Sequence, residues 1–183
     1  DNYIRIFTRK RSLAPFINSM RMALLAAILS VIVALPAAYT VTKTRTRLKP
    51  VFEFLLMLPF ALPASAIAIN MINGFSSVLL GKWVLLPLAY FVSMFPMAVR
   101  SVTISYERLK DQYMEASMNL GAGGVTTFLR IILPLVSPGV WSGFLLVFIR
   151  SLGEYTISAF LFTAANRPIS MAMVNSMFEF EIG

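Results

Sequence analysis

Long apolar runs alternate with short basic segments along this chain. Residues 22–42 contain no charged side chain. At about 1.5 Å per residue they would form a helix of roughly 31 Å, enough to cross a hydrocarbon core of about 30 Å. Similar runs predict spans over residues 51–71, 83–99 and 131–149. The pattern therefore predicts an all-α, polytopic transmembrane helical bundle in one domain, residues 1–183.

The end of the fourth run is ambiguous. Residues 155–165 are also apolar, but Arg150 and Glu154 interrupt the pattern. Either the fourth helix continues outward to about residue 163 with Glu154 at its margin, or a re-entrant turn begins near Gly153. A charge at mid-bilayer costs at least ~2.5 kcal/mol, so Glu154 is expected to reach water, a partner or a pore.

Two prolines interrupt the second apolar run. Pro59 and Pro63 each remove a helical hydrogen bond, which predicts a second helix that is kinked or broken near mid-membrane. Broken helices in transporters often line the substrate path, so Pro59, Pro63 and Glu154 are candidate pathway or gate residues. A purely structural kink is the alternative.

Small residues also predict close contacts between helices. In the first run they recur at every fourth position, which lets a second helix approach. In the fourth run Gly139 and Gly143 have the spacing of a close contact, although such pairs also arise by accident in apolar segments. The small residues of the first run are Ala26, Ser30, Ala34 and Ala38.

The composition supports a membrane protein and excludes several chemistries. Hydrophobic residues make up 58% of the chain and charged residues 13%, against about 25% in a soluble domain. The absence of His and Cys excludes disulfides, thiolate or imidazole metal sites and His-dependent nucleophilic catalysis, so we expect no catalytic residue, metal or cofactor. The net charge of +8 lies mainly at the ends of apolar runs, which favours a lipid bilayer over nucleic acid as the partner.

The basic residues also predict which side each loop occupies. Residues 43–49 and 100–130 together hold eight Lys or Arg, whereas three lie in the segments predicted on the opposite side. By the positive-inside rule the first two segments are cytoplasmic. Residues 1–21 add five cations to the other side and are left out of this comparison. They are interpreted either as an amphipathic segment on the membrane surface or as a loop followed by the start of a helix.

The longest segment that is not mainly apolar, Tyr113–Pro134, predicts a helix, a glycine turn and a second helix entering the membrane. Gly121 stands where a helix end needs positive φ, and Thr126 or Thr127 could cap the helix that follows. Five apolar residues at near-helical spacing predict one stripe on a short helix before the turn. They are Tyr106, Leu109, Tyr113, Ala116 and Leu120.

This segment resembles a signature of inner-membrane permease subunits in binding-protein-dependent ABC importers, written E-A-A-x3-G-x9-I-x-L-P. All the spacings match, and Ser117 replaces the second Ala. The sequences at Asn18–Met20, Leu58–Pro63 and Ser151–Leu161 resemble other features of the same family. The matching residues are Glu115, Ala116, Ser117, Gly121, Ile131, Leu133 and Pro134.

The resemblance implies a type I permease-like subunit in the bacterial inner (cytoplasmic) membrane. It implies that residues 100–130 form a cytoplasmic coupling segment that binds a separate ATP-binding cassette ATPase subunit. It further implies a second permease subunit or half, and an external solute-binding protein that delivers the substrate. The chain lacks the P-loop pattern GxxxxGK[ST], so ATP hydrolysis is expected on the partner and not on this chain.

Two other classes of function remain as alternatives. A secondary transporter or channel would carry ionisable residues within its spans, and the four spans hold none near their centres. A membrane scaffold protein would not account for the ordered polar segment. The resemblance extends to permeases for iron(III), aminoethylphosphonate, molybdate, sulfate and polyamines, among which iron(III) or a phosphonate is the expected substrate. Neither end resembles a natural terminus, and we interpret the chain as part of a longer permease.

Overall fold

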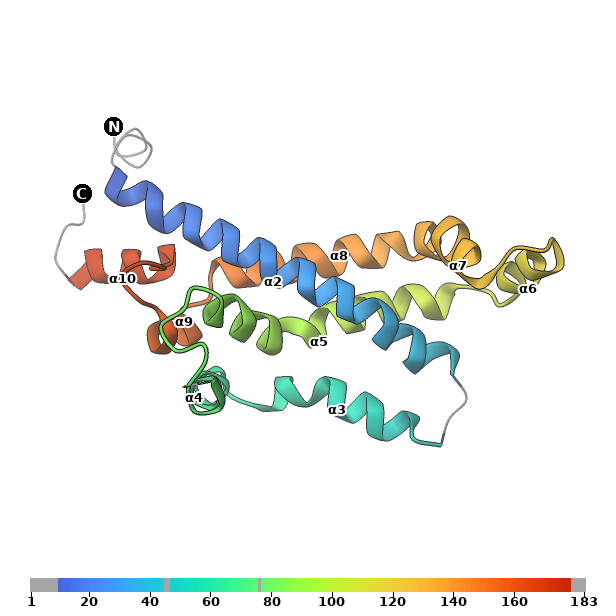
Figure 1. Cartoon of the computed structure of the whole chain (residues 1–183), viewed down its shortest axis with the longest axis horizontal. Coiled ribbons are helices and arrows are strands. Elements are labelled where there is room, and N and C mark those ends of the chain that lie inside the picture. Colours follow the sequence, from blue (N-terminus) through green and yellow to red (C-terminus); the bar gives the residue numbers. More distant parts are fainter. Residues whose placement is uncertain (1–9, 45–46, 76, 179–183) are drawn as a thin grey trace.

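Three long helices lie side by side along the long axis of the molecule (Figure 1). They are α2 (Lys10–Lys43), α5 (Leu85–Arg108) and α8 (Leu133–Leu152) in a computed structural model that describes residues 10–44, 47–75 and 77–178. The described residues contain helices and no strand, which confirms the predicted all-α fold class. The shorter elements are α3 (Lys49–Ala61), α4 (Ala64–Phe75), α6 (Gln112–Asn119), α7 (Gly124–Thr127), the π-helical turn η1 (Phe128–Ile132), α9 (Thr156–Leu161) and α10 (Ile169–Phe178).

Three continuous stretches are long and apolar enough to cross a membrane: Leu13–Lys43, Leu85–Arg108 and Gly124–Leu152. They contain most of the apolar runs predicted at 22–42, 83–99 and 131–149, and each is longer than its run. Helix α5, which contains the third apolar run, continues past Arg100 and ends at Arg108, because Val102 and Tyr106 continue its buried face. Helix α2 begins by Lys10, so the second half of the basic segment 1–21 is the start of a helix, while residues 1–9 lie outside the described residues.

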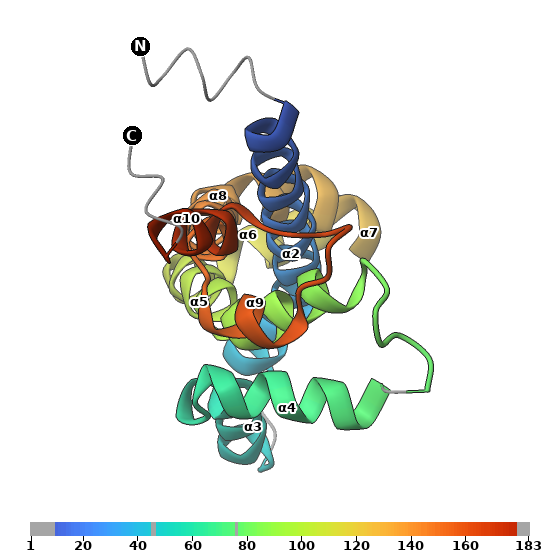
Figure 2. The same ribbon diagram turned by 90° about the vertical axis from the view of Figure 1, so that its left-hand side faces the viewer.

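The predicted break of the second apolar run is confirmed. Helices α3 and α4 meet at an angle of 102°, and the chain between them is extended at Leu62 (φ −95°, ψ 133°). Pro63 explains this geometry, because the ring of a proline disfavours the helical region for the residue before it. Pro59 stays inside α3, so the break lies at the second of the two prolines. As a result α4 runs across the bundle and not along it (Figure 2).

The predicted stripe of small residues on α2 is also confirmed. Ala26, Ser30, Ala34 and Ala38 are all fully buried. Helix α2 packs along both α5 and α8, and small side chains on its inner face let the backbones approach. The stripe therefore places α2 in the groove between the other two long helices.

Two glycines bring α8 into direct contact with α5. A Cβ on Gly139 would lie 2.3 Å from Ser105 Oγ and 2.7 Å from the carbonyl oxygen of Ser101, and one on Gly143 would lie 3.1 Å from the Cα of Ala98. The Ser101 hydroxyl donates a hydrogen bond to the carbonyl of Gly139 at 3.0 Å. The glycine pair is therefore the close helix contact that its spacing allows, and not an accident of composition.

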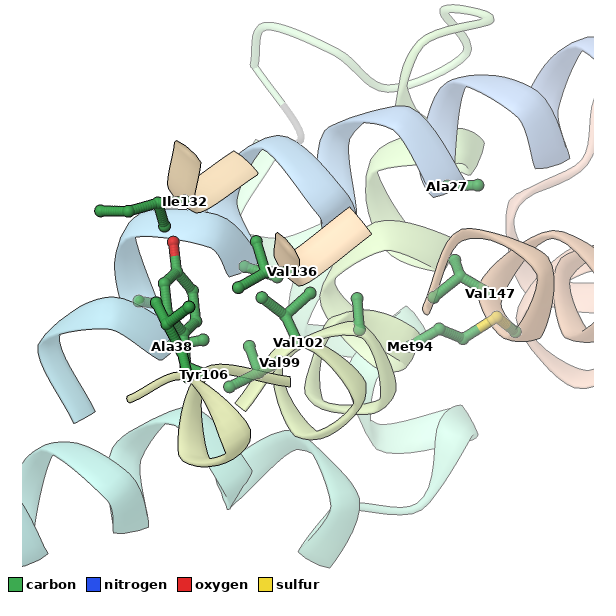
Figure 3. Packing of buried hydrophobic residues seen from close by; sticks show 13 residues of the cluster. Ala27, Ala38, Met94, Val99, Val102, Tyr106, Ile132, Val136 and Val147 are labelled. Carbon is green, nitrogen blue, oxygen red and sulfur yellow. The ribbon is translucent and has the colours of Figure 1, made fainter. Parts of the chain in front are cut away.

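The buried apolar residues form two clusters, one toward each end of the bundle. In the first, Tyr106 extends from α5 between Ala38 and Ile132, while Met94 lies near Val147 (Figure 3). The second joins α2 and α5 to α4 and α9. Its members are Met22, Ala26, Ile67, Ala68, Met71, Leu85, Leu86, Ala89, Tyr90, Ile157 and Leu161.

The contact between α5 and α8 yields a first prediction. Gly139→Ala should lower the thermal stability of the detergent-solubilised protein, because its Cβ would overlap Ser105 and the backbone of Ser101. Overpacking of this kind costs about 1–3 kcal/mol. Gly153→Ala is the matched control, since a Cβ there meets no described atom within 4 Å. Equal melting temperatures for the two variants would contradict the packing argument.

Candidate functional site

Helix α6 stands at one end of the molecule, beyond the ends of the long helices (Figure 1). Helix α5 stops at Arg108 because Leu109 leaves the helical region (φ −77°, ψ 115°), and α6 begins at Gln112. The predicted stripe from Tyr106 to Leu120 on one helix is therefore wrong. Tyr106 and Leu109 are buried in the core, whereas Leu120 is 88% exposed. Burial of Leu109 in the first cluster, a contact distant in sequence, decides where the chain turns.

Gly121 ends α6 as predicted, with φ +82°. Its N–H donates to the carbonyl of Met118 at 2.9 Å, and the N–H of Ala122 donates to the carbonyl of Ser117 at 3.1 Å. These two bonds are the Schellman pattern, which satisfies the last carbonyls of a helix and needs a residue that tolerates positive φ. The turn at Gly121 therefore fixes the direction in which the chain leaves α6.

The second helix begins at α7, but neither threonine caps it. Gly123 is the N-cap, without a side-chain capping bond, so the prediction for Thr126 or Thr127 is wrong. Instead the hydroxyls of Thr127 and Ser117 form a hydrogen bond of 2.8 Å, and both residues are nearly fully buried. Ser117, which replaces the second Ala of the pattern, thus fastens α6 to α7 directly.

The last residues of the pattern lie where the chain passes into α8. Ile131 belongs to the π-helical turn η1, and Leu133 and Pro134 open α8. Proline cannot donate a hydrogen bond to the preceding turn, and a π turn is one way to accommodate such a missing donor. Ile131 and Leu133 are partly buried and Pro134 is exposed. This group therefore shapes the junction between α7 and α8.

The segment from α6 to α7, called the tip below, has one face that is apolar and exposed. Met114 and Ser117 turn inward, Met114 against the first core cluster. Glu115 and Ala116 are exposed, and Glu115 lies in the first turn of α6, where a negative charge suits the helix dipole. Large apolar side chains surround them with no described neighbour to cover them. These are Tyr113 (48% exposed), Met118 (59%), Leu120 (88%) and Val125 (76%).

Lys43, at the end of α2, forms hydrogen bonds with the connection that leads into α6. The Lys43 ammonium donates to the carbonyl of Leu109 at 2.7 Å and to Asp111 Oδ1 at 2.5 Å. The Lys43 side chain is only 13% exposed, whereas that of Asp111 is 69% exposed. The sequence showed Lys43 only as one cation in a basic loop. Its partners lie 66 and 68 positions away, so no local pattern could have identified this contact.

The other candidate site residues lie on two breaks in the chain. Pro63 lies at the break between α3 and α4, Pro59 lies in the last turn of α3, and Glu154 lies in the turn between α8 and α9. Helix α8 ends at Leu152, so it does not continue to residue 163, and the turn near Gly153 is the correct alternative. Helices α4 and α9 pack together, which joins the two breaks at one level of the bundle (Figure 1).

Glu154 forms hydrogen bonds within the protein. Its Oε1 accepts a hydrogen bond of 3.0 Å from the N–H of Ile157 at the start of α9. Its carbonyl accepts from the hydroxyls of Ser158 at 2.6 Å and Ser170 at 2.9 Å. The hydroxyls of Ser158 and Tyr90 also form a buried hydrogen bond of 2.6 Å, which fixes α9 against α5. Glu154 therefore reaches a partner, as expected, and that partner is the start of α9.

A family model described as the binding-protein-dependent transport system inner membrane component matches residues 26–183. The chain belongs to this family. As a permease of this family with several membrane-length apolar helices, it is a multi-pass protein of the bacterial inner membrane.

Individual relatives agree with this assignment. The probable ABC transporter permease protein y4fN of Sinorhizobium fredii is 30% identical over 95% of the chain and 32% of its own length. The sulfate transport system permease protein CysT of Escherichia coli is 30% identical over 90% of the chain and 63% of its own length. This permease chain thus spans a third to just under two thirds of these relatives.

A solved structure supports the fold. A chain of a bacterial ABC transporter for import of the acidic polysaccharide alginate superposes with a TM-score of 0.79. The match covers 99% of this permease chain and 63% of the other, at 19% sequence identity. At that identity the similarity concerns the arrangement of helices and not the substrate.

The bond between Ser117 and Thr127 yields a second prediction. Ser117→Ala restores the family residue but leaves the buried Thr127 hydroxyl unpaired, which costs about 1–3 kcal/mol. Amide hydrogen exchange over residues 112–127 should therefore become roughly tenfold faster, because local opening is easier. Thr126→Val, at an exposed neighbouring position, should leave the exchange unchanged. Equal protection in wild type and Ser117→Ala would refute the role of this bond.

Proposed function

We propose that this chain is the transmembrane permease subunit of an ATP-driven, binding-protein-dependent importer, and that α6 docks on a separate ATPase subunit. The observation that carries the proposal is the tip itself. An exposed apolar face with a carboxylate is held on a short helix that is fixed at both ends. Such a surface suits a protein partner, because soluble surfaces seldom leave a cluster of large apolar residues uncovered.

The geometry supports a mechanical role for the pattern residues. Leu120, Met118 and Tyr113 would enter a groove on the ATPase, and the exposed Glu115 would meet a cation or a helix N-terminus there. Ala116, small and exposed, lets the two backbones approach. Gly121 and the junction through Ile131, Leu133 and Pro134 would carry movement of α6 into α8. ATP hydrolysis itself belongs to the partner, since this chain has no P-loop pattern.

The substrate pathway is proposed to pass the two breaks. Pro63 would set the bend that lets α3 and α4 line the path, with Pro59 on α3 close to it, and Glu154 would position α9 opposite α4. All of α3 is described and none of its residues is buried, so one flank of the molecule is open to a second permease subunit or half. An external solute-binding protein would deliver the substrate. Iron(III) or a phosphonate, favoured by the sequence resemblance, is the substrate to test first, with sulfate next because of its relative.

The rival transporter classes gain no support from Glu154 or Glu53. Glu154 is bonded to the start of α9, and Glu53 lies 3.9 Å from Lys49 near the start of α3. A proton- or sodium-driven carrier needs an ionisable group that is free to change its partner within the membrane. Glu154 is bonded within the protein, and Glu53 lies near one end of the bent pair of helices α3 and α4 and not near its middle.

The docking role of α6 yields a third prediction. Gly121→Val and Glu115→Lys should leave the protein inserted while reducing ATPase co-purification or substrate uptake by the assembled transporter. A Cβ at φ +82° costs roughly 1–2 kcal/mol and would redirect α6, and the second change reverses the charge offered to the partner.

Each of these variants has a matched control. Gly123→Val places the same side chain in the same loop, at ordinary backbone angles (φ −71°, ψ 158°) and with no described atom within 4 Å of its Cβ. Glu107→Lys makes the same charge reversal at an exposed site on α5. Normal uptake and normal co-purification in both Gly121→Val and Glu115→Lys would refute the docking role.

Sidedness yields a fourth prediction. The end of α2 at Lys43 and helix α6 lie at one end of the molecule, and residues 77–82 lie toward the other (Figure 1). Because the chain has no cysteine, single cysteines are clean probes. A cysteine at the exposed Ser77 should react from outside intact cells, and one at the exposed Asn119 only after permeabilisation. The reverse result would invert the topology. A cysteine at Ser105, on the same side as Asn119, would be a poor probe because that position packs against Gly139.

A further inference from the structure

Helix α2 (Lys10–Lys43) is attached at Lys43, and again in its first half at Asn18 and Ser19, to segments that are distant in sequence. At one end Lys43 bonds to Leu109 and Asp111, the residues that join α5 to α6. In the first half of the helix the hydroxyl of Ser19, which is almost fully buried, accepts a hydrogen bond of 2.8 Å from the N–H of Ile169. The side chain of Asn18 adds weaker bonds of 3.3–3.4 Å to the carbonyls of Arg167 and Ala165.

We propose that α2 is a strut that transmits movement of α6 to the connection between α9 and α10 at the opposite end of the bundle. Lys43 and Ser19 are its two attachment points. The inference rests on the proposed docking of α6 on an ATPase. It goes further by assigning positioning roles to two residues outside the E-A-A-x3-G-x9-I-x-L-P signature, and by naming the outer segment that responds.

The Lys43 attachment is well placed for this task. Lys43 binds the connection between α5 and α6, since Leu109 ends α5 and Asp111 precedes the first residue of α6. Leu109 is buried in the first core cluster, so its carbonyl is a firm point. The ammonium is largely shielded from water, so its charge-assisted bond to the Leu109 carbonyl is screened less than one on a surface, whereas the Asp111 carboxylate is 69% exposed. Rotation of α6 about this connection must either carry the end of α2 or break the bond between Lys43 and Asp111.

The body of α2 is suited to carry the movement. It is one helix of 34 residues that continues through Pro15 and Pro36. Its inner face is buried against α5 and α8 along most of its length, and it contributes to both core clusters. A helix held by close packing transmits displacement along its axis, because packed interiors are not readily compressed.

The Ser19 attachment connects this movement to the outer segment. Ile169 begins α10, and the connection before it runs from Phe162 to Pro168. Within that connection the Asn166 carboxamide oxygen accepts a hydrogen bond from the N–H of Thr163, so the segment is a folded turn and not a loose loop. Displacement of Ser19 would therefore move the turn as a unit, together with α10.

The test uses the assembled transporter in lipid nanodiscs, with one cysteine at the exposed Ala165 carrying a spin label or fluorophore. The measurement is the change in probe mobility when ATP and vanadate trap the ATPase subunits in the closed state. Wild type should show a clear change. Lys43→Met and Ser19→Ala should reduce that change about fivefold or more, the lower range of usual coupling between sites. Lys43→Arg, which keeps the charge and the donors, should retain it.

Two matched controls separate the strut from general damage. Lys49→Met removes a nearby lysine whose partner, Glu53, is on its own helix. Ser30→Ala removes a buried serine of α2 whose hydroxyl has no hydrogen-bond partner among the described residues. Both should respond like wild type. If Lys43→Met does not assemble, Asp111→Ala replaces it, since Asp111 is exposed and its side chain makes no capping bond in α6.

The outcomes are distinct from those that test the proposed function. Absence of an ATPase subunit from the purified wild-type transporter would refute the docking of α6. With the ATPase bound, an unchanged response in both Lys43→Met (or Asp111→Ala) and Ser19→Ala would overturn the strut alone. So would an equal loss in the Lys49→Met and Ser30→Ala controls, or a wild-type probe at Ala165 that does not respond to the trapped state.

Discussion

The close approach of α5 and α8 is the constraint on which the rest of the structure depends. No side chain larger than hydrogen fits at Gly139 without moving Ser105 or the backbone of Ser101. The two helices that enter and leave the tip are therefore held at a fixed separation, and the connection between them must complete its turn within a short span. Helix α6, its glycine turn and the junction at Pro134 are the solution to that geometry. Helix α2 then fills the groove with small residues, completing a three-helix unit.

Features set by local chemistry could be predicted from the sequence. The apolar runs gave the long helices, Pro63 forced the residue before it out of the helical region, and Gly121 marked a turn that needs positive φ. These outcomes depend on neighbours within a few positions. The same is true of the stripe of small residues on α2, because its spacing of four is the repeat of a helix.

Features set by contacts distant in sequence could not be predicted. Leu109 ends α5 because it is buried among residues of other helices, which no local pattern records. Thr127 looked like a capping residue, but its hydroxyl is paired with Ser117 across the turn. Glu154 was ambiguous because the hydropathy of residues 155–165 fits either a straight helix or a turn. Hydrogen bonds to α9 and α10 decided the matter.

The open flank formed by α3 has a consequence for how such subunits find one another. Lipid tails solvate an exposed apolar helix about as well as a protein partner does, so a helix with no buried residue gains little from leaving the lipid. A second permease subunit that packs along this flank, as proposed, would therefore be recognised mainly by the shape of the apolar surface. On that proposal, related importers in one membrane would keep their subunits from exchanging by the fit of such surfaces. Steric matching of the two surfaces, and not greater hydrophobicity, would then prevent the pairing of wrong subunits.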